Sequence, residues 1–159
     1  LMIGLLKQKK TAEEMSNSLN YFQDILPDDM YQKLFSLILT DRGSEFAKPQ
    51  LFEINHETGE IRGNIFYCDA QMPSQKPHVE NNHEFIRNII PKKQNMKDLT
   101  QDKLNLMFSH INSVPRKSLG GKTPYEAFEF FYGKETLDKL NIQKIEKDKV
   151  TLQPYLLKI

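Results

Sequence analysis

The sequence predicts an α/β protein, because short apolar runs that suit strands alternate along the chain with longer stretches of helical periodicity. The chain has 159 residues, and its 44 Leu, Ile, Val and Phe side chains are enough for one buried core. Lys and Arg number 22 against 21 acidic residues, for a net charge of +1. Total charge therefore indicates no partner, and any affinity for nucleic acid must come from local patches.

Several classes of protein are excluded by composition. No apolar run approaches the roughly 20 residues that span a bilayer, and the basic residues near the N-terminus follow the first apolar run instead of preceding it, unlike a signal peptide. The single cysteine, Cys68, cannot form an intramolecular disulfide, and with only four histidines a cysteine-rich zinc module is excluded. We therefore expect a protein of a reducing, cytoplasmic compartment, without a membrane partner.

The first elements are a strand and a helix. The chain opens directly on an apolar run, residues 2–6, which predicts a strand and which suggests a fragment more than the start of a natural domain. Thr11 and Glu14 form a capping box. The helix after it is amphipathic and ends before Pro27, with inward positions at Met15, Leu19, Phe22 and Leu26.

Two further strands each end at an aspartate. Residues 34–40 form an apolar run short enough for a strand buried on both faces, and Asp41 follows it within a turn. A short helix is expected over residues 49–55. A third strand, residues 64–68, ends at Asp69.

The second half of the chain predicts helices. Pro77 suits the first turn of a helix that continues to Pro91, and a basic loop follows at residues 92–97. Thr100 caps the next helix. A second capping box, Thr123-Pro124-Tyr125-Glu126, precedes a helix to Tyr132, and the tail after Asn141 is charged and then extended.

Asp41 is a candidate site residue because ligands of open α/β sheets gather beyond the carboxyl ends of the strands. Gly43 lets the chain turn away and leaves the Asp41 carboxylate exposed at a cleft. Asp69 is placed in the same way after its own strand. The alternative for each is a turn residue that bonds nearby backbone amides.

Glu80 is a second candidate, because it lies in or just after the first turn of its predicted helix, where the helix dipole favours an ionised acid. An ionised carboxylate is a suitable ligand for a hard cation. The helical wheel places Glu80 near Lys76 and Arg87, at the edge of the apolar stripe. The alternative is a glutamate that complements the dipole and pairs with Arg87.

Other patterns are weaker. His78 and His83 are five residues apart and do not share a helix face, so a zinc site with Cys68 is not expected. Two basic loops flank the helix that Thr100 caps, and such loops either contact phosphates or are solvated; their basic residues are Lys92, Lys93, Lys97, Arg116, Lys117 and Lys122.

Three blocks of residues, in order, resemble bacterial insertion-sequence transposases of the IS-thirty type. Residues 40–46, Thr-Asp-Arg-Gly-Ser-Glu-Phe, resemble the T-D-N-G-S-E-F segment of that family, and residues 75–87 with Pro91-Lys92 resemble its second block, Q-K-(G/P)-x-x-E-N-x-(N/H)-x-x-(I/L)-R followed by P-K. The closing block is similar to His110-Ile111-Asn112, Pro115-Arg116-Lys117 and Gly121-Lys122-Thr123-Pro124. The resemblance covers residues 7 to 132.

The resemblance implies a fold and a chemistry. The family's catalytic core is the ribonuclease-H-like fold of retroviral integrases, a mixed sheet flanked by helices, in which three acids hold two Mg²⁺ or Mn²⁺ ions for DNA cleavage and strand transfer. Asp41 matches the second acid and Glu80 the third, whereas Asp69 matches none. Residues expected to orient DNA or to steady Glu80 are Lys76, Asn81, His83, Arg87 and Lys92. Element-end and target DNA, further copies of the enzyme and a nucleoid-associated location follow as expectations, with no small-molecule cofactor.

Two departures from the family pattern affect these expectations. Arg42 replaces the usual Asn, and either approaches the metal site or points to solvent. The family's first acid lies upstream on a central strand, and no acid before Asp41 can replace it, because Glu13, Glu14 and Asp24 belong to a helix pattern and Asp28 and Asp29 to a turn.

The sequence therefore predicts part of a transposase. Residues 1–114 are expected to form a partial catalytic core that lacks its first two strands, and residues 115–159 a C-terminal helical extension and tail. We expect this chain to be inactive alone. The alternative is a non-catalytic remnant, or an inhibitor that associates with intact transposase.

Overall fold

The computed structural model describes residues 1–69 and 77–158, with the backbone alone for residues 77–81. The chain divides into two compact units. We call residues 7–77 the strand unit, and residues 1–6 together with 78–159 the helical unit. Helices and strands both occur, so the prediction of an α/β protein is confirmed at that level.

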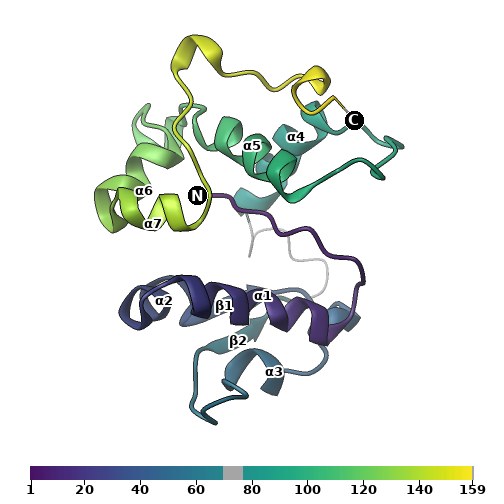
Figure 1. Cartoon of the computed structure of the whole chain (residues 1–159), viewed down its shortest axis with the longest axis vertical. Coiled ribbons are helices and arrows are strands. Elements are labelled where there is room, and N and C mark those ends of the chain that lie inside the picture. The colour runs from purple at the N-terminus through teal and green to yellow at the C-terminus, as the bar shows by residue number, and fades with distance from the viewer. Residues whose placement is uncertain (70–76, 159) are drawn as a thin grey trace. The chain divides into compact units, whose positions relative to one another are not determined.

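The strand unit contains a two-stranded parallel sheet with helices beside it (Figure 1). The strands pair in register from Leu37 opposite Asn64 to Thr40 opposite Tyr67. Its elements are α1 (Ala12–Ile25), α2 (Asp28–Phe35), β1 (Leu37–Thr40), the short 3₁₀ turn η1 (Ser44–Phe46), α3 (Gln50–Glu53) and β2 (Asn64–Tyr67). The short helix and the strand expected after Asp41 are thus confirmed within a few residues.

One face of the sheet packs against the helices. Leu19 of α1, Phe52 of α3 and Ile65 of β2 form a buried cluster, and Ile38 of β1 packs against it. Thr11 caps α1, since its side chain accepts a hydrogen bond from the Glu14 amide at 3.2 Å. The amphipathic helix predicted after Thr11 is therefore confirmed.

The other face of the sheet is open within the strand unit. Leu37, Leu39 and Phe66 are 63%, 47% and 52% exposed, because alternate residues of a strand point to opposite faces. The prediction of a strand buried on both faces is therefore wrong for the described residues. Residues 34 and 35 also belong to α2 and not to the strand.

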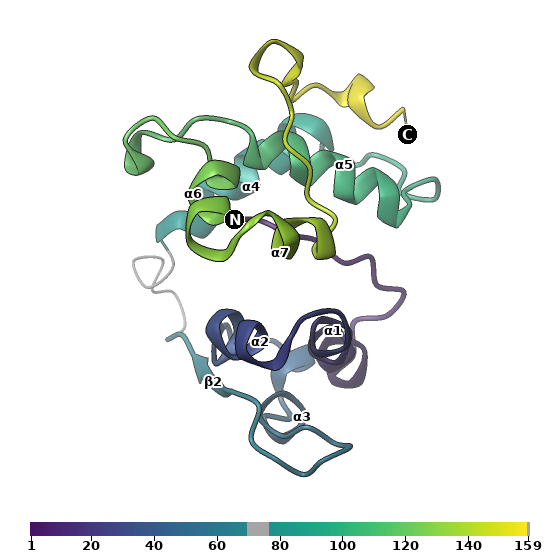
Figure 2. The ribbon, with the colours of Figure 1, turned by 60° about the vertical axis from the view of Figure 1, so that its left-hand side comes forward.

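The helical unit is built around α5 (Figure 2). Thr100 caps α5 through the Lys103 amide at 3.3 Å, and Thr123 forms a complete capping box with Glu126, so both predicted caps are confirmed. Its elements are α4 (Pro77–Ile89), α5 (Gln101–Asn112), α6 (Pro124–Tyr132), α7 (Lys134–Lys139) and the 3₁₀ turns η3 (Lys117–Leu119), η4 (Lys147–Lys149) and η5 (Pro154–Leu156).

The N-terminal run is extended but is not a strand. Asn112 exchanges two hydrogen bonds with the backbone of Met2, at 2.8 and 2.6 Å, and Gln101 contacts the Leu6 amide at 2.9 Å and the Gly4 carbonyl at 2.8 Å. A Cβ atom on Gly4 would lie 2.0 Å from the Phe108 ring. The strand predicted at residues 2–6 is therefore wrong, because side-chain amides of α5 take the place of a neighbouring strand.

The C-terminal tail is held along α5 by buried polar side chains. Ser109 and Ser113 accept hydrogen bonds from the Gln143 and Ile145 amides, each at 3.0 Å. His110 Nδ1 accepts a hydrogen bond from the Thr151 amide at 3.1 Å. One helix therefore anchors both ends of the helical unit.

The stability of the helical unit is expected to fall at acidic pH because of His110. Burial lowers the pKa of His110, and its Nδ1 must be unprotonated to accept the Thr151 amide. As the pH falls, His110 is therefore protonated at a higher pH in the unfolded chain than in the folded protein. The free energy of unfolding is therefore full above pH ~6.5 and decreases as the pH falls below it, by at most about 1.4 kcal/mol per pH unit.

Urea unfolding of the wild type and of His110→Gln at several pH values measures this effect. The decrease in the free energy of unfolding below pH ~6.5 should be smaller in His110→Gln than in the wild type. It should be unchanged in the matched variant His56→Gln, because His56 is exposed in the strand unit. Equal slopes in all three proteins would contradict the role of His110.

Candidate functional site

Asp41 lies at the carboxyl end of the parallel strands, as the sequence predicted. It follows β1 directly and its side chain is exposed. Its Oδ1 atom accepts a hydrogen bond from the Gly43 amide at 3.0 Å, which is the turn contact that was the alternative role for this residue. This bond orients the carboxylate and leaves Oδ2 without a hydrogen bond among the described residues. The turn contact and a ligand role are therefore compatible.

A second carboxylate, Glu45, lies in the same turn and was not selected from the sequence. Its side chain is 12% exposed and pairs with Lys10 at 3.1 Å. The pKa of Glu45 is lowered, chiefly by a hydrogen bond from its own backbone amide and then by Lys10. Burial and, to a smaller extent, the charge of Asp41 act in the opposite direction. Asp41 and Glu45 are therefore electrostatic neighbours. In the sequence, Glu45 lies four residues after Asp41, within the block of residues 40–46 that resembles the transposase family.

A hollow of about 410 Å³ adjoins the turn that begins at Asp41. Its lining residues are Arg42, Gly43, Ala47, Pro49 and Tyr67. The Tyr67 hydroxyl donates to the Phe46 carbonyl at 2.5 Å and so fixes one wall. This end of the sheet therefore has room for a ligand beside an ordered turn.

Arg42 points along the surface toward Asp69. The Arg42 guanidinium lies 3.8 Å from Asp69 Oδ1, and both side chains are more than 60% exposed. Arg42 is therefore exposed and paired with Asp69, and its approach to a bound metal ion stays a prediction. An exposed pair of this kind contributes little to stability, at most about 1 kcal/mol.

Glu80 is the fourth residue of α4, so its backbone position in the first turn of a helix is as predicted. Its side chain is outside the described residues. Asp41 belongs to the strand unit and Glu80 to the helical unit, and the structure does not define the placement of one unit relative to the other. The convergence of Asp41 and Glu80 on shared metal ions therefore remains a prediction.

The residues expected to orient DNA divide into two sets. His83, Arg87 and Lys92 are exposed at or just beyond α4. The side chains of Lys76 and Asn81 are outside the described residues. The three exposed residues are accessible to a large ligand such as DNA.

The acids that precede Asp41 lie on helices. Glu13, Glu14 and Asp24 are in α1, as expected, and Glu13 pairs with Lys48. Asp28 and Asp29 were expected in a turn and instead begin α2, where carboxylates complement the helix dipole. None of them stands at the end of a described strand.

No group of three or more His, Cys, Asp and Glu side chains in the described part of the chain is arranged to hold a metal ion. The side chain of Glu80 is not among these described residues. Within the same residues, no helix is long and apolar enough to cross a membrane.

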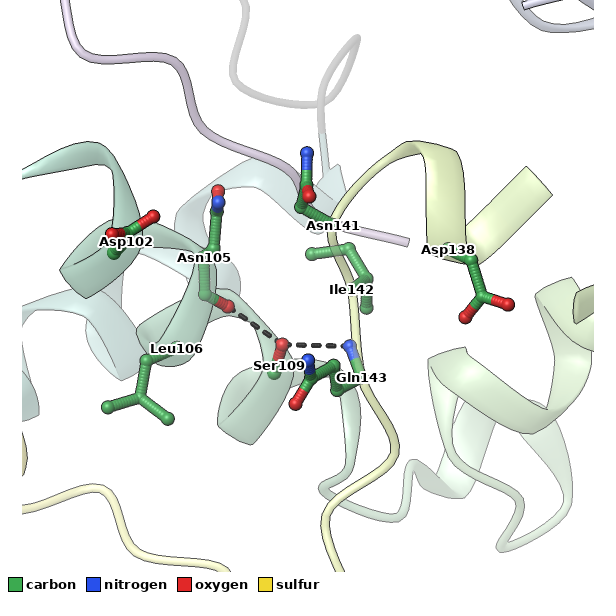
Figure 3. Close-up of a pocket in the computed structure, with 8 residues that line it drawn as sticks. All are labelled: Asp102, Asn105, Leu106, Ser109, Asp138, Asn141, Ile142 and Gln143. Carbon is green, nitrogen blue, oxygen red and sulfur yellow. Dashed lines mark hydrogen bonds between the residues drawn. The ribbon is translucent and has the colours of Figure 1, made fainter. Parts of the chain in front are cut away.

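A separate polar hollow of about 440 Å³ lies between α5 and the start of the tail (Figure 3). At its centre the Ser109 hydroxyl donates to the Asn105 carbonyl at 2.7 Å and accepts from the Gln143 amide at 3.0 Å. Asp138, at its edge, pairs with Lys134 at 3.0 Å. Ser109 thus joins α5 to the tail inside this hollow, and none of the predicted site residues lines it.

Curated relatives confirm the resemblance to insertion-sequence transposases. The chain is 38% identical over 89 residues to the transposase InsI for insertion sequence element IS30A of Escherichia coli, and this match covers 56% of the chain and 22% of the relative. It is 32% identical over 98 residues to the transposase for element IS4351 of Bacteroides fragilis, covering 62% of the chain and 28% of the relative.

A third relative extends the same pattern. The transposase for element IS1086 of Cupriavidus metallidurans is 28% identical over 103 residues, which are 65% of the chain and 29% of that protein. No family model and no solved structure matches the chain. The chain thus spans less than a third of the length of these three relatives.

Proposed function

We propose that this chain, which is similar to insertion-sequence transposases over more than half its length, supplies part of the catalytic region of a transposase that cleaves and joins DNA. The similarity to several transposases carries the proposal. The exposed Asp41 carboxylate at the end of β1 supports it, because that position suits a ligand at the edge of a parallel sheet. The parallel pair of β1 and β2 supports the assignment to a ribonuclease-H-like sheet.

Asp41 and Glu80 are the residues that would hold Mg²⁺ or Mn²⁺ ions. Carboxylate oxygens are the donors that these hard cations prefer, and the exposed Asp41 carboxylate fits that requirement. When bound, such ions neutralise the negative charge that grows on the attacking and leaving oxygens during displacement at phosphorus. The Gly43 amide restrains the Asp41 carboxylate, and the helix dipole favours the ionised form of Glu80.

Basic and polar groups beside these acids would position the DNA. His83, Arg87 and Lys92 are exposed, and we assign them, with Lys76 and Asn81, to contacts with phosphates or to the support of Glu80. Contacts of this kind fix the register of a DNA strand without reading its sequence.

The same chain is proposed to be inactive alone. The five acids before Asp41 lie in α1 and α2, so none of them offers a carboxylate at the end of a described strand beside β1. Asp41 and Glu80 together can bind a metal ion, but two carboxylates are too few ligands to hold both metal ions for catalysis. We therefore infer that activity requires the parts of the longer relatives that this chain does not match.

A two-part experiment tests this function. The isolated chain is assayed for Mg²⁺-dependent nicking of element-end DNA, and the expected result is no cleavage above background. In a chimaera, this chain replaces the corresponding part of the Escherichia coli transposase, and we expect transposition to be restored relative to a deletion of that part. A well-folded chimaera without activity, or robust nicking by the isolated chain, would contradict the proposal.

The open face of the strand unit favours a second candidate function. Leu37, Leu39 and Phe66 expose apolar surface on one face of the sheet, and such surfaces are typical of association sites. A chain that associates with an intact transposase through this face, without completing its active site, would act as an inhibitor. Co-expression of this chain with an intact transposase distinguishes an inhibitor from an inert remnant. An inhibitor lowers the transposition frequency of the intact enzyme, and an inert remnant does not.

A further inference from the structure

The loop between α5 and α6 is closed and ordered. It is the second of the two basic loops of the sequence, and from here on we call residues 115–122 the basic loop; it contains Arg116, Lys117 and Lys122. The Arg116 amide donates to the Lys122 carbonyl at 2.9 Å, and the Gly121 amide donates to the Arg116 carbonyl at 3.0 Å. Gly120 and Gly121 have φ angles of 62° and 85°, a conformation that favours glycine, so the closure is specific to this sequence.

Arg116 is held at the base of this loop. Its guanidinium carbon lies 3.9 Å from the centre of the Phe85 ring of α4, and one of its N–H groups reaches the Ile111 carbonyl at 3.4 Å. The side chain is half-buried, and burial lowers the pKa of the guanidinium. Among the described residues, no carboxylate forms an ion pair with Arg116 or Lys117. A fixed cation without a counter-charge favours an anion.

A hollow of about 700 Å³ adjoins this cation, entirely within the helical unit. Its charged and polar lining comes from Arg116, Lys117 and Ser118 of the basic loop and from Asn82 and the one acid, Glu84, of α4. Asn112 also lines it, but its side-chain amide is bonded to the Met2 backbone. Lys117 and Ser118 are exposed at its rim. Its two cations, Arg116 and Lys117, outnumber its one acid, Glu84, so the lining carries a net positive charge.

We infer that the hollow between the basic loop and α4 is a phosphate-binding site for the DNA backbone, in which Arg116 and Lys117 bind phosphodiester oxygens. The inference rests on the proposed function, and it adds a contact outside the residues assigned to the metal site and its surroundings. Arg116 is the fixed contact, because Phe85 holds its guanidinium plane. Lys117 is the exposed contact at the rim. Both read the backbone and not the base sequence.

Fluorescence anisotropy of the full chain with a labelled duplex of about 30 base pairs tests the site over a range of salt concentrations. Lys117→Gln and Arg116→Met are each expected to weaken binding about tenfold and to lower the salt dependence by about one released counterion. Glu84→Gln removes the one acid of the hollow and is expected to tighten binding about threefold. A duplex of unrelated sequence should show the same ratios.

The matched control is Lys149→Gln, which removes the same charge from an exposed lysine of the same unit. It is expected to change the affinity less than twofold. Lys117 is exposed, so Lys117→Gln keeps the test valid if Arg116→Met disturbs the packing on Phe85. Segment-resolved hydrogen exchange of α5 and α6 checks the fold of each variant.

The inference is overturned if Lys117→Gln and a folded Arg116→Met lose no more affinity than Lys149→Gln, or if the wild-type chain does not bind the duplex at low salt. Failure of the proposed function is a different result. An inactive, folded chimaera whose DNA binding still depends on the basic loop would refute the catalytic proposal and leave this site intact. An active chimaera, together with basic-loop variants that bind DNA as tightly as the wild type, would support the catalytic proposal and refute this site.

Discussion

Replacing Asp41 with Asn, or Glu80 with Gln, in the chimaera with the Escherichia coli relative is expected to lower transposition at least about 1,000-fold. Each substitution removes a negative oxygen ligand while keeping the size of the side chain. Metal ions contribute several kcal/mol to stabilising displacement at phosphorus, and each 1.4 kcal/mol corresponds to a factor of ten in rate. The frequency of transposition in cells, with protein abundance measured in parallel, provides the test.

Asp69→Asn is the matched control for this prediction. Asp69 also follows a strand and carries the same charge, but it pairs with Arg42 on the exposed surface. We expect its substitution to change transposition less than about threefold, since exposed pairs contribute at most about 1 kcal/mol. An Asp41→Asn chimaera that transposes as often as the Asp69→Asn chimaera would refute the assignment of Asp41.

Replacing Arg62 with Met is expected to lower the free energy of unfolding of the strand unit by about 3 kcal/mol. Arg62 is 3% exposed, and its guanidinium donates to the backbone carbonyls of Phe52, at 3.1 Å, and of Leu51. It also contacts Asn20 and Gln23 of α1. Methionine fills much of the volume but leaves one buried carbonyl, that of Phe52, and one partly buried carbonyl, that of Leu51, without the Arg62 donors. An unsatisfied buried carbonyl costs about 1–3 kcal/mol.

Segment-resolved hydrogen exchange in increasing urea measures this loss separately for the two units. Protection of α1 and β2 should fall in Arg62→Met, while protection of α5 stays at the wild-type level. Arg42→Met removes the same charge from an exposed position and should change the free energy of unfolding by less than about 0.5 kcal/mol. Equal losses in the two variants would show that Arg62 does not join α1, α3 and β2.

Helix starts were predictable from the sequence because their signals are local. Thr11, Thr100 and Thr123 each cap the helix that the sequence assigned to them, through an amide three residues ahead. The β2 strand was found for a similar reason, since its apolar run is short and ends at turn residues. A signal that lies within one turn of the chain can be identified without information on which residues pack against it.

The errors concern features that depend on distant residues. An extended run at residues 2–6 has the same apolar pattern whether its partner is a strand or, as here, Gln101 and Asn112 of α5. Leu37 and Leu39 are exposed although their run suggested burial on both faces. Helix α2 was missed because Asp28 and Asp29 suit both a turn and the first turn of a helix.

The candidate site was predictable in part for the same reason. Asp41 was selected by its position after a strand, and the structure confirms that position. Glu45 was not selected as a site residue, and Arg116 was noted only as one of six basic loop residues that either contact phosphates or are solvated. What distinguishes the two is burial and the contacts with Lys10 and with Phe85. Those contacts join residues that are 31 to 35 positions apart, and no local pattern encodes them.

The central claim is that Asp41 and Glu80 bind the same metal ions, and paramagnetic broadening by Mn²⁺ tests it most directly. In amide NMR spectra of the ¹⁵N-labelled chain, substoichiometric Mn²⁺ is expected to broaden the signals of residues 41–43 and 79–81 together, and Glu80→Gln should weaken both effects in parallel. Broadening confined to one of the two segments, or broadening at residues 41–43 that is unchanged in Glu80→Gln, would contradict a shared site.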